Sequence, residues 1–149
     1  MSDAGAGPEN LLTVWAELLV DALVEGGVRD VVASPGSRST PFLLAAARHP
    51  GLRLRAAIDE RAAAFFALGL ARVTRRPPAL LCTSGTAPAH YFPAVVEASE
   101  AALPLVVLSA DRPGALRGTG APQTTDQRQL YGAHARAFVD LGDPQPTPG

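Results

Sequence analysis

Small polar side chains, arginines and a few carboxylates gather in four short segments of this sequence, 34–39, 59–61, 83–86 and 111–126. Glycine and serine let a ligand approach the backbone closely, and arginine binds carboxylates through paired hydrogen bonds. Glu60 adds a carboxylate at an expected helix start, where complementing the helix dipole is an equally good explanation. Serine, threonine and aspartate are also ordinary helix caps. It is the repetition over four segments that favours a ligand site.

Several familiar sites are excluded by spacing. Gly118-Thr-Gly120 is followed by Ala-Pro-Gln, which is not a dinucleotide fingerprint, and there is no Gly-Lys-Ser/Thr phosphate loop. The three histidines are scattered without metal-ligand spacing. Ser84-Gly85 lacks the preceding glycine of a nucleophile elbow. Cys82 lies in an apolar run and is expected to be a small buried residue, not a nucleophile.

Alternating helix and strand periods must position the four segments. Helices are expected from residue 11 to the Gly26-Gly27 stop and at 40–48, 59–73, 86–100 and 125–131, and strands at 30–33, 53–57, 78–82, 103–109 and 137–141. This order predicts a single doubly wound α/β domain, a mostly parallel sheet with helices on both faces. Continuous apolar runs favour strands buried on both faces. The four segments then follow the carboxyl ends of strands, where such sheets bind ligands.

Length and composition indicate one soluble domain. The chain has 149 residues, 47% hydrophobic and 18% charged, with a formal net charge of −1. Such a balance argues against a nucleic-acid partner. One cysteine rules out a disulfide within the chain, and no signal peptide or membrane span is evident, so a cytoplasmic location is expected. We expect a flexible tail at 1–9, the domain at 10–142 and a Pro-rich linker or tail at 143–149.

Five motifs carry a resemblance to a known family. They are Ser34-Pro-Gly-Ser-Arg-Ser-Thr-Pro41, Ile58-Asp-Glu-Arg61, Thr83-Ser-Gly-Thr-Ala87, Ala110-Asp-Arg-Pro113 and Gly118-Thr-Gly-Ala-Pro-Gln123. In this order and spacing they resemble the N-terminal, pyrimidine-binding domain of the 2-succinyl-5-enolpyruvyl-6-hydroxy-3-cyclohexene-1-carboxylate synthase (MenD) family, thiamin-diphosphate transferases of menaquinone biosynthesis. The resemblance runs from the first helix to about Leu141. It implies decarboxylation of 2-oxoglutarate on thiamin diphosphate and addition of the product to isochorismate.

The resemblance also assigns roles to residues. Glu60 matches the catalytic and cofactor-binding glutamate, which hydrogen-bonds a ring nitrogen of the aminopyrimidine and favours the tautomer that deprotonates the thiazolium carbon. Thr83, Ser84 and Gly85 match the loop beside the cofactor. The positions that match the family's substrate pocket are Ser37, Arg38, Arg112 and Gln123. The roles of His90 and Pro88 stay open, because the family more often has asparagine at the first position and the second is also atypical.

One part of the family pattern has no match in this sequence. Family members continue into a domain that binds the diphosphate and Mg²⁺ through Gly-Asp-Gly and a downstream asparagine, so the resemblance implies no metal site on this chain and no activity without that domain. A homo-oligomer is implied, because two subunits build the site. Two alternatives are open: one subunit of a split thiamin-dependent 2-oxoacid decarboxylase, or a non-catalytic dimerising domain.

Overall fold

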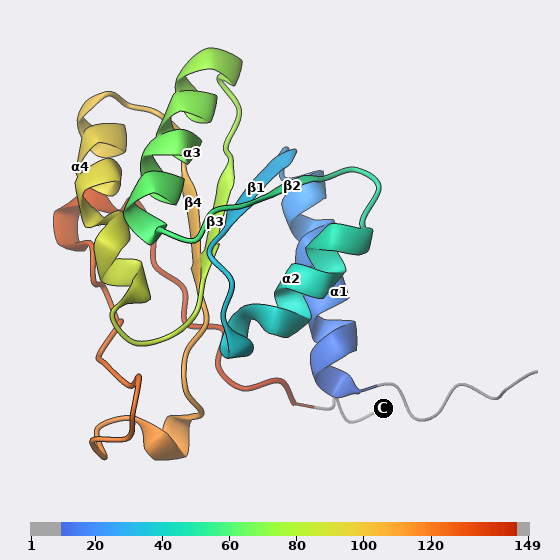
Figure 1. The fold of residues 1–149 in the computed structure, drawn as a ribbon, viewed down its shortest axis with the longest axis vertical. Helices are drawn as coiled ribbons and strands as arrows, with labels where there is room; N and C mark the ends of the chain where they lie inside the picture. The colour runs from blue at the N-terminus through green and yellow to red at the C-terminus, as the bar shows by residue number, and fades with distance from the viewer. Residues whose placement is uncertain (1–9, 146–149) are drawn as a thin grey trace, which may run out of the picture.

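Four parallel strands form the centre of the protein, in the order β2-β1-β3-β4 (Figure 1). The computed structural model describes residues 10–145. The strands are β1 Asp30–Ala33, β2 Arg53–Ala56, β3 Ala79–Cys82 and β4 Val106–Ser109. The helices are α1 Leu11–Glu25, α2 Thr40–Arg48, α3 Glu60–Thr74 and α4 Phe92–Glu100, with short 3₁₀ turns η1 Ser37–Ser39, η2 Ala87–Tyr91, η3 Gly114–Leu116 and η4 Gly132–His134. The parallel, doubly wound α/β fold is confirmed.

Helices cover both faces of the sheet, with α1 and α2 on one side and α3 and α4 on the other (Figure 1). Successive side chains of a strand point to opposite faces. Val31 and Ala33 therefore pack with α1 and α2, whereas Val32 packs with α3 and α4. None of the helices in residues 10–145 has the length and hydrophobicity that crossing a lipid bilayer requires.

Between β1 and β3 the sheet has a switch point, where the chain reverses the direction in which it adds strands. From β1 the chain moves outward to β2, and from β3 it moves the opposite way to β4. In open parallel sheets ligands bind at such a switch point, outside the carboxyl ends of the strands. The loops that leave β1 and β3 there are 34–39 and 83–86, two of the four polar segments.

The expectation that all strands are buried on both faces is wrong for the edges. β1 and β3 are buried throughout, whereas β2 and β4 are exposed or half-buried at every position. β2 and β4 are the outer strands, so each has a neighbour on one side only within the described sheet. The arginines of β2, Arg53 and Arg55, are compatible with that place, because edge strands tolerate charged side chains.

Expectations for the last described segment are also wrong. Residues 125–131 form no helix: 125–127 are irregular and 128–131 form a turn, in which Gln129 has a φ of +52° that interrupts a helix. Residues 137–141 form no strand. Ion pairing of Asp140 with Arg117, at 2.8 Å, ties this segment to a loop instead of to a sheet edge. The tail expected at 1–9, and residues 146–149 of the linker, lie outside the described residues.

Prolines shorten two further elements. The helix expected at 86–100 divides into η2 and α4, with Pro88 and Pro93 in the first turns of each, where a missing N–H costs nothing. The strand expected at 103–109 begins only at Val106, after Ala102 with a φ of +50° and Pro104. The remaining expected helices and strands are confirmed within one or two residues.

A buried carboxylate fastens the start of β1 to the edge strand. Asp30 is 5% exposed and accepts hydrogen bonds from Arg53 Nη2 at 2.7 Å and from Arg55 Nη1 at 2.6 Å. The hydrogen bond from Arg53 is the main reason that the pKa of Asp30 lies below its ordinary value, against the opposing effect of burial. The ionised form of Asp30 therefore stabilises the fold.

This ion cluster predicts a pH-dependent stability. Because the folded-state pKa of Asp30 is lowered, its contribution is present above the unfolded pKa of 3.8 and is lost as pH falls through the folded value. Asp30→Asn is expected to lower the free energy of unfolding at pH 6 by about 1 kcal/mol, a modest value because both arginines are partly exposed. Urea unfolding at pH 6 and pH 3 checks this, and an equal difference at both values would contradict it.

Candidate functional site

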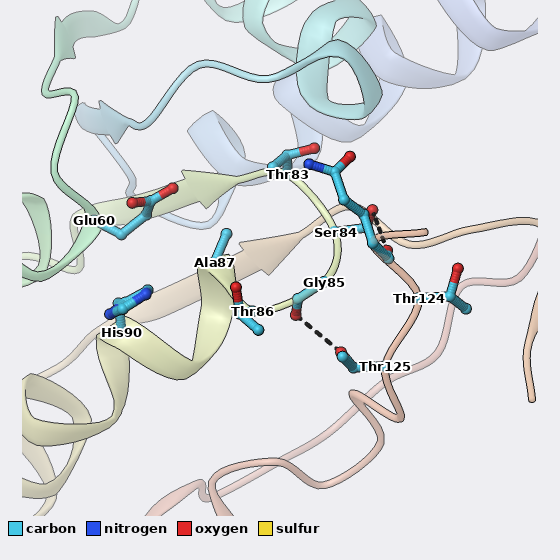
Figure 2. A pocket seen from close by; sticks show the side chains of 10 residues that line it. Glu60, Thr83, Ser84, Gly85, Thr86, Ala87, His90, Thr124 and Thr125 are labelled. Atoms are coloured by element: carbon cyan, nitrogen blue, oxygen red, sulfur yellow. Dashed lines mark hydrogen bonds between the residues drawn. The ribbon is translucent and has the colours of Figure 1, made fainter. Parts of the chain in front are cut away.

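A pocket of about 390 Å³ lies at the carboxyl edge of the sheet. Ten residues line it, from the start of α3, the loop after β3, the turn η2 and the segment before η4: Glu60, Thr83, Ser84, Gly85, Thr86, Ala87, His90, Gln123, Thr124 and Thr125. Figure 2 shows the labelled side chains around the cavity, with Glu60 on one side and Thr125 on the other. The structure thus brings Glu60, Thr83, Ser84, Gly85 and Gln123 together, as the sequence predicts for neighbouring strand-end loops.

Glu60 reaches the pocket because its neighbour caps the helix. Asp59 is the N-cap of α3, and its Oδ1 accepts a hydrogen bond from the backbone N–H of Ala62 at 2.7 Å. The cap satisfies one of the free amides of the first turn. Glu60 is half-buried, and no hydrogen bond joins its carboxylate to another residue in 10–145. The carboxylate lines the pocket without a hydrogen-bond partner among these residues and is therefore available to a ligand.

The loop after β3 forms the floor of the pocket. Ser84 is 2% exposed, and its hydroxyl donates a hydrogen bond to the carbonyl oxygen of Gln123 at 2.9 Å. Gly85 has a φ of +85°, in the left-handed region that favours glycine. A Cβ at Gly85 would lie 3.1 Å from Gln123 Cα. The segment from 122 to 125 can therefore pack directly on the backbone of this loop.

Ser37 and Arg38 lie beside the pocket and do not line it. Both are exposed in η1, and neither side chain makes a hydrogen bond within residues 10–145. Their loop nevertheless abuts the loop after β3, because a Cβ built on Gly36 would lie 2.4 Å from Thr83 Cβ. The two loops at the switch point are thus in contact. Ser37 and Arg38 are exposed at that junction.

Arg112 is also absent from the lining, and its guanidinium is largely engaged. Nε and Nη2 of Arg112 donate to the carbonyl oxygen of Pro122, at 3.3 and 2.9 Å. The neighbouring Arg117 pairs with Asp111 at 3.1 Å and with Asp140 at 2.8 Å. These bonds shape the long loop after β4. The two bonds of Arg112 fix the carbonyl group of Pro122, the residue directly before the pocket residue Gln123.

Five residues of the lining had no assigned role in the sequence analysis: Thr86, Ala87, His90, Thr124 and Thr125. Thr86, Thr124 and Thr125 nevertheless lie inside the polar segments 83–86 and 111–126. The signal for Thr124 and Thr125 was two hydroxyl side chains directly after Gln123. His90 faces the pocket from the end of η2 (Figure 2). Pro88 is buried, and its carbonyl oxygen accepts a hydrogen bond from the hydroxyl of Tyr131 at 2.8 Å. This bond joins η2 to the last described segment.

The charge of the pocket restricts what it can bind. Glu60 is the acidic residue of the lining, His90 is the other titratable one, and the lining contains no arginine or lysine. Within residues 10–145 no three His, Cys, Asp or Glu side chains are placed to hold a metal ion. The lining therefore fits an uncharged or cationic ring with hydrogen-bonding atoms better than it fits a phosphate group.

Beneath the pocket lies a buried polar cluster of Ser34, Cys82 and Tyr91. Burial is the main cause that raises the pKa of the Tyr91 hydroxyl, and the nearby Cys82 and Glu60 add to it. Burial likewise raises the pKa of the Cys82 thiol to about 12, with the charge of Glu60 as a smaller cause. The buried cysteine expected from the sequence is confirmed.

The thiol predicts slow alkylation. At pH 8 a thiol with a pKa near 12 holds almost no thiolate, and the fully buried sulfur is inaccessible. Iodoacetamide is therefore expected to label the native chain at least about tenfold more slowly than the urea-unfolded chain. Mass spectrometry of timed samples measures both rates. Comparable rates would contradict the burial of Cys82.

Comparison with known proteins identifies a family and similar proteins that match most of this chain. The family model described as "Thiamine pyrophosphate enzyme, N-terminal TPP binding domain" matches residues 14–130. Three similar proteins are each named 2-succinyl-5-enolpyruvyl-6-hydroxy-3-cyclohexene-1-carboxylate synthase. They come from Geobacillus kaustophilus (62% identity over 90% of this chain), Halorubrum lacusprofundi (58% over 93%) and Listeria innocua (53% over 92%). The matched regions cover 23%, 22% and 24% of these relatives, so the chain spans about a quarter of their length.

Proposed function

This chain belongs to the thiamine pyrophosphate enzymes as their N-terminal, TPP-binding domain, and from that membership we propose that its pocket binds the aminopyrimidine half of thiamin diphosphate. The observation that carries the proposal is the pocket itself, in which a half-buried carboxylate faces a neutral lining of hydroxyl and backbone groups. An aminopyrimidine offers ring nitrogens and an amino group to such a lining. The diphosphate finds no cationic side chain there.

The carboxyl group of Glu60 would hold the aminopyrimidine by a hydrogen bond to a ring nitrogen. Exchange of a proton between this carboxyl group and the ring nitrogen would be its contribution to general acid–base catalysis. The loop of Thr83, Ser84 and Gly85 lines the pocket and would limit the access of water to the ring. Thiamin diphosphate, when bound, supplies the electron sink that decarboxylation of a 2-oxo acid needs. The role of this chain is therefore to bind and orient the aminopyrimidine and to exchange a proton with its ring nitrogen.

The relatives named above suggest the overall reaction. We propose that the protein carrying this domain decarboxylates 2-oxoglutarate and adds the product to isochorismate, as a transferase of menaquinone biosynthesis in the cytoplasm. Ser37 and Arg38 project beside the pocket as donors for substrate carboxylates, and Gln123 lies in the lining. Arg112 keeps Nη1 outside its two bonds to Pro122 and contributes that nitrogen.

Turnover then requires groups that residues 10–145 do not provide. We propose that Mg²⁺ and the diphosphate bind a further domain of the same or another chain in a homo-oligomer, and that this chain by itself is inactive. The length of the relatives, about four times that of the matched region, is consistent with such a domain. If the domain proves to be a separate polypeptide, the chain is one subunit of a split decarboxylase.

Binding of two related ligands tests the proposal. Thiamin and thiamin diphosphate are each titrated into the ¹⁵N-labelled chain and followed by NMR. We expect shifts centred on Glu60 and Gly85, and dissociation constants that agree within about twofold, because the pocket offers no counter-charge to the diphosphate. Absence of binding at millimolar thiamin, or a tenfold preference for the diphosphate, overturns the assignment. The first outcome favours a non-catalytic dimerising domain.

A further inference from the structure

Both peptide groups that flank Gln123 are held by side chains from elsewhere in the chain. On one side the Pro122 carbonyl oxygen accepts hydrogen bonds from Nε and Nη2 of Arg112, at 3.3 and 2.9 Å. On the other side the Gln123 carbonyl oxygen accepts a hydrogen bond from the hydroxyl of Ser84 at 2.9 Å. The orientation of the two peptide planes around a residue determines its φ and ψ. The backbone conformation of Gln123 is thus imposed from outside the segment.

That conformation is one that glutamine rarely adopts. Gln123 has a φ of +55°, in the left-handed region, where the backbone of any residue other than glycine is strained. Strained backbone persists where surrounding contacts over-determine it, and such positions cluster at ligand sites. Gln123 lines the pocket that also contains Glu60. The strained residue is therefore part of the pocket lining.

A second bond runs in the opposite direction between the same two segments. The hydroxyl of Thr125 donates to the carbonyl oxygen of Gly85 at 2.9 Å, the dashed line that joins them in Figure 2. The bonds of Ser84 and Thr125 are therefore reciprocal, each a hydroxyl bound to a backbone carbonyl of the other segment. We call Ser84, Arg112 and Thr125 the Gln123 latch.

We propose that the Gln123 latch consists of positioning residues, which hold the carboxamide of Gln123 in the pocket so that it hydrogen-bonds the ligand bound beside Glu60. Arg112 in this view acts mainly through the Pro122 carbonyl. The ligand's identity rests on the proposed function, whereas the latch itself does not. A carboxamide both donates and accepts, which suits the mixed hydrogen-bonding edge of an aminopyrimidine.

Matched variants at Thr125 separate the hydroxyl from the shape of the side chain. Thr125→Val removes the hydroxyl, Thr125→Ser keeps it, and the exposed position makes both compatible with folding. In the ligand-free chain, ¹⁵N relaxation is expected to show increased mobility of the Gln123 backbone amide in Thr125→Val and a wild-type value in Thr125→Ser. Ser84→Ala is expected to reproduce the effect of Thr125→Val. Unchanged Gln123 mobility in both Thr125→Val and Ser84→Ala overturns the latch.

A double-mutant cycle with thiamin as the probe tests whether Thr125 acts through Gln123. Thr125→Val and Gln123→Ala are each expected to weaken thiamin binding roughly three- to tenfold, the usual range for one hydrogen bond. In the Gln123→Ala background, Thr125→Val is expected to cause no further loss, because the group that it positions is gone. A further loss of the same factor overturns the positioning role. If wild type binds no thiamin, the proposed function fails, and the relaxation experiment alone decides on the latch.

Discussion

Replacing Glu60 by glutamine is expected to lower cofactor-dependent turnover by about 10²–10⁴-fold, the range that general acid–base catalysis contributes. Glutamine keeps the size of the side chain and can still donate a hydrogen bond, but it has no acidic proton to transfer to a ring nitrogen. The measurement is made in the assembled enzyme, with this domain, the diphosphate-binding domain, Mg²⁺, 2-oxoglutarate and isochorismate present. Exchange of the thiazolium C2 proton for deuterium, followed by NMR, reports the activation step directly and should slow by a similar factor.

The neighbouring carboxylate supplies the control. Asp59→Asn removes a negative charge one residue away, yet asparagine caps helices as well as aspartate does. Asp59 lies outside the pocket lining, and its Oδ1 is bonded to the Ala62 amide. This variant should keep turnover and C2 exchange within a few-fold of wild type. If both variants lose activity equally, negative charge at the start of α3 matters, and the specific role of Glu60 is wrong.

Adding one methyl group at Gly36 is expected to lower the free energy of unfolding by about 1–3 kcal/mol, the usual cost of overpacking. In Gly36→Ala the new Cβ would lie 2.4 Å from Thr83 Cβ and 2.8 Å from Thr83 Cγ2. Thr83 Cβ is attached directly to the backbone, so relief requires the loops at the switch point to separate. Because Thr83 lines the pocket, thiamin affinity should fall as well. Thermal and urea unfolding measure the first effect.

Gly69→Ala is the matched control for this substitution. Gly69 lies in the middle of α3, and a Cβ there meets no atom within 4 Å. Alanine is the better helix former, so this variant should raise the free energy of unfolding by about 0.5–1 kcal/mol. The same chemical change is thus expected to have opposite signs at two glycines. A Gly36→Ala chain as stable as wild type would show that the two loops can separate at no cost.

Much of the fold could be predicted because its determinants are local. Apolar residues at helical spacing, a cap at Asp59 and the Gly26-Gly27 stop lie within a few residues of the structure that they specify. The sites of Glu60 and the 83–85 loop also follow, because carboxyl ends of parallel strands meet at one edge. The failures at 125–131 and 137–141 have the opposite character. They depend on the positive φ of Gln129 and on the ion pair of Asp140 with Arg117. Neither feature is visible in the spacing of apolar residues along the sequence.

The sequence by itself determined the α/β class, the order of the elements and a carboxylate at the start of α3, since each depends on neighbours along the chain. Tertiary structure alone decided that β2 and β4 are edges and that His90 and Thr125 line the pocket. It also decided that Arg112 binds the Pro122 carbonyl, and that Ser84 meets Gln123 across 39 residues. Contacts of that range arise only when the packed sheet brings separate loops together, which is why Gln123 holds a strained conformation that its own neighbours do not specify.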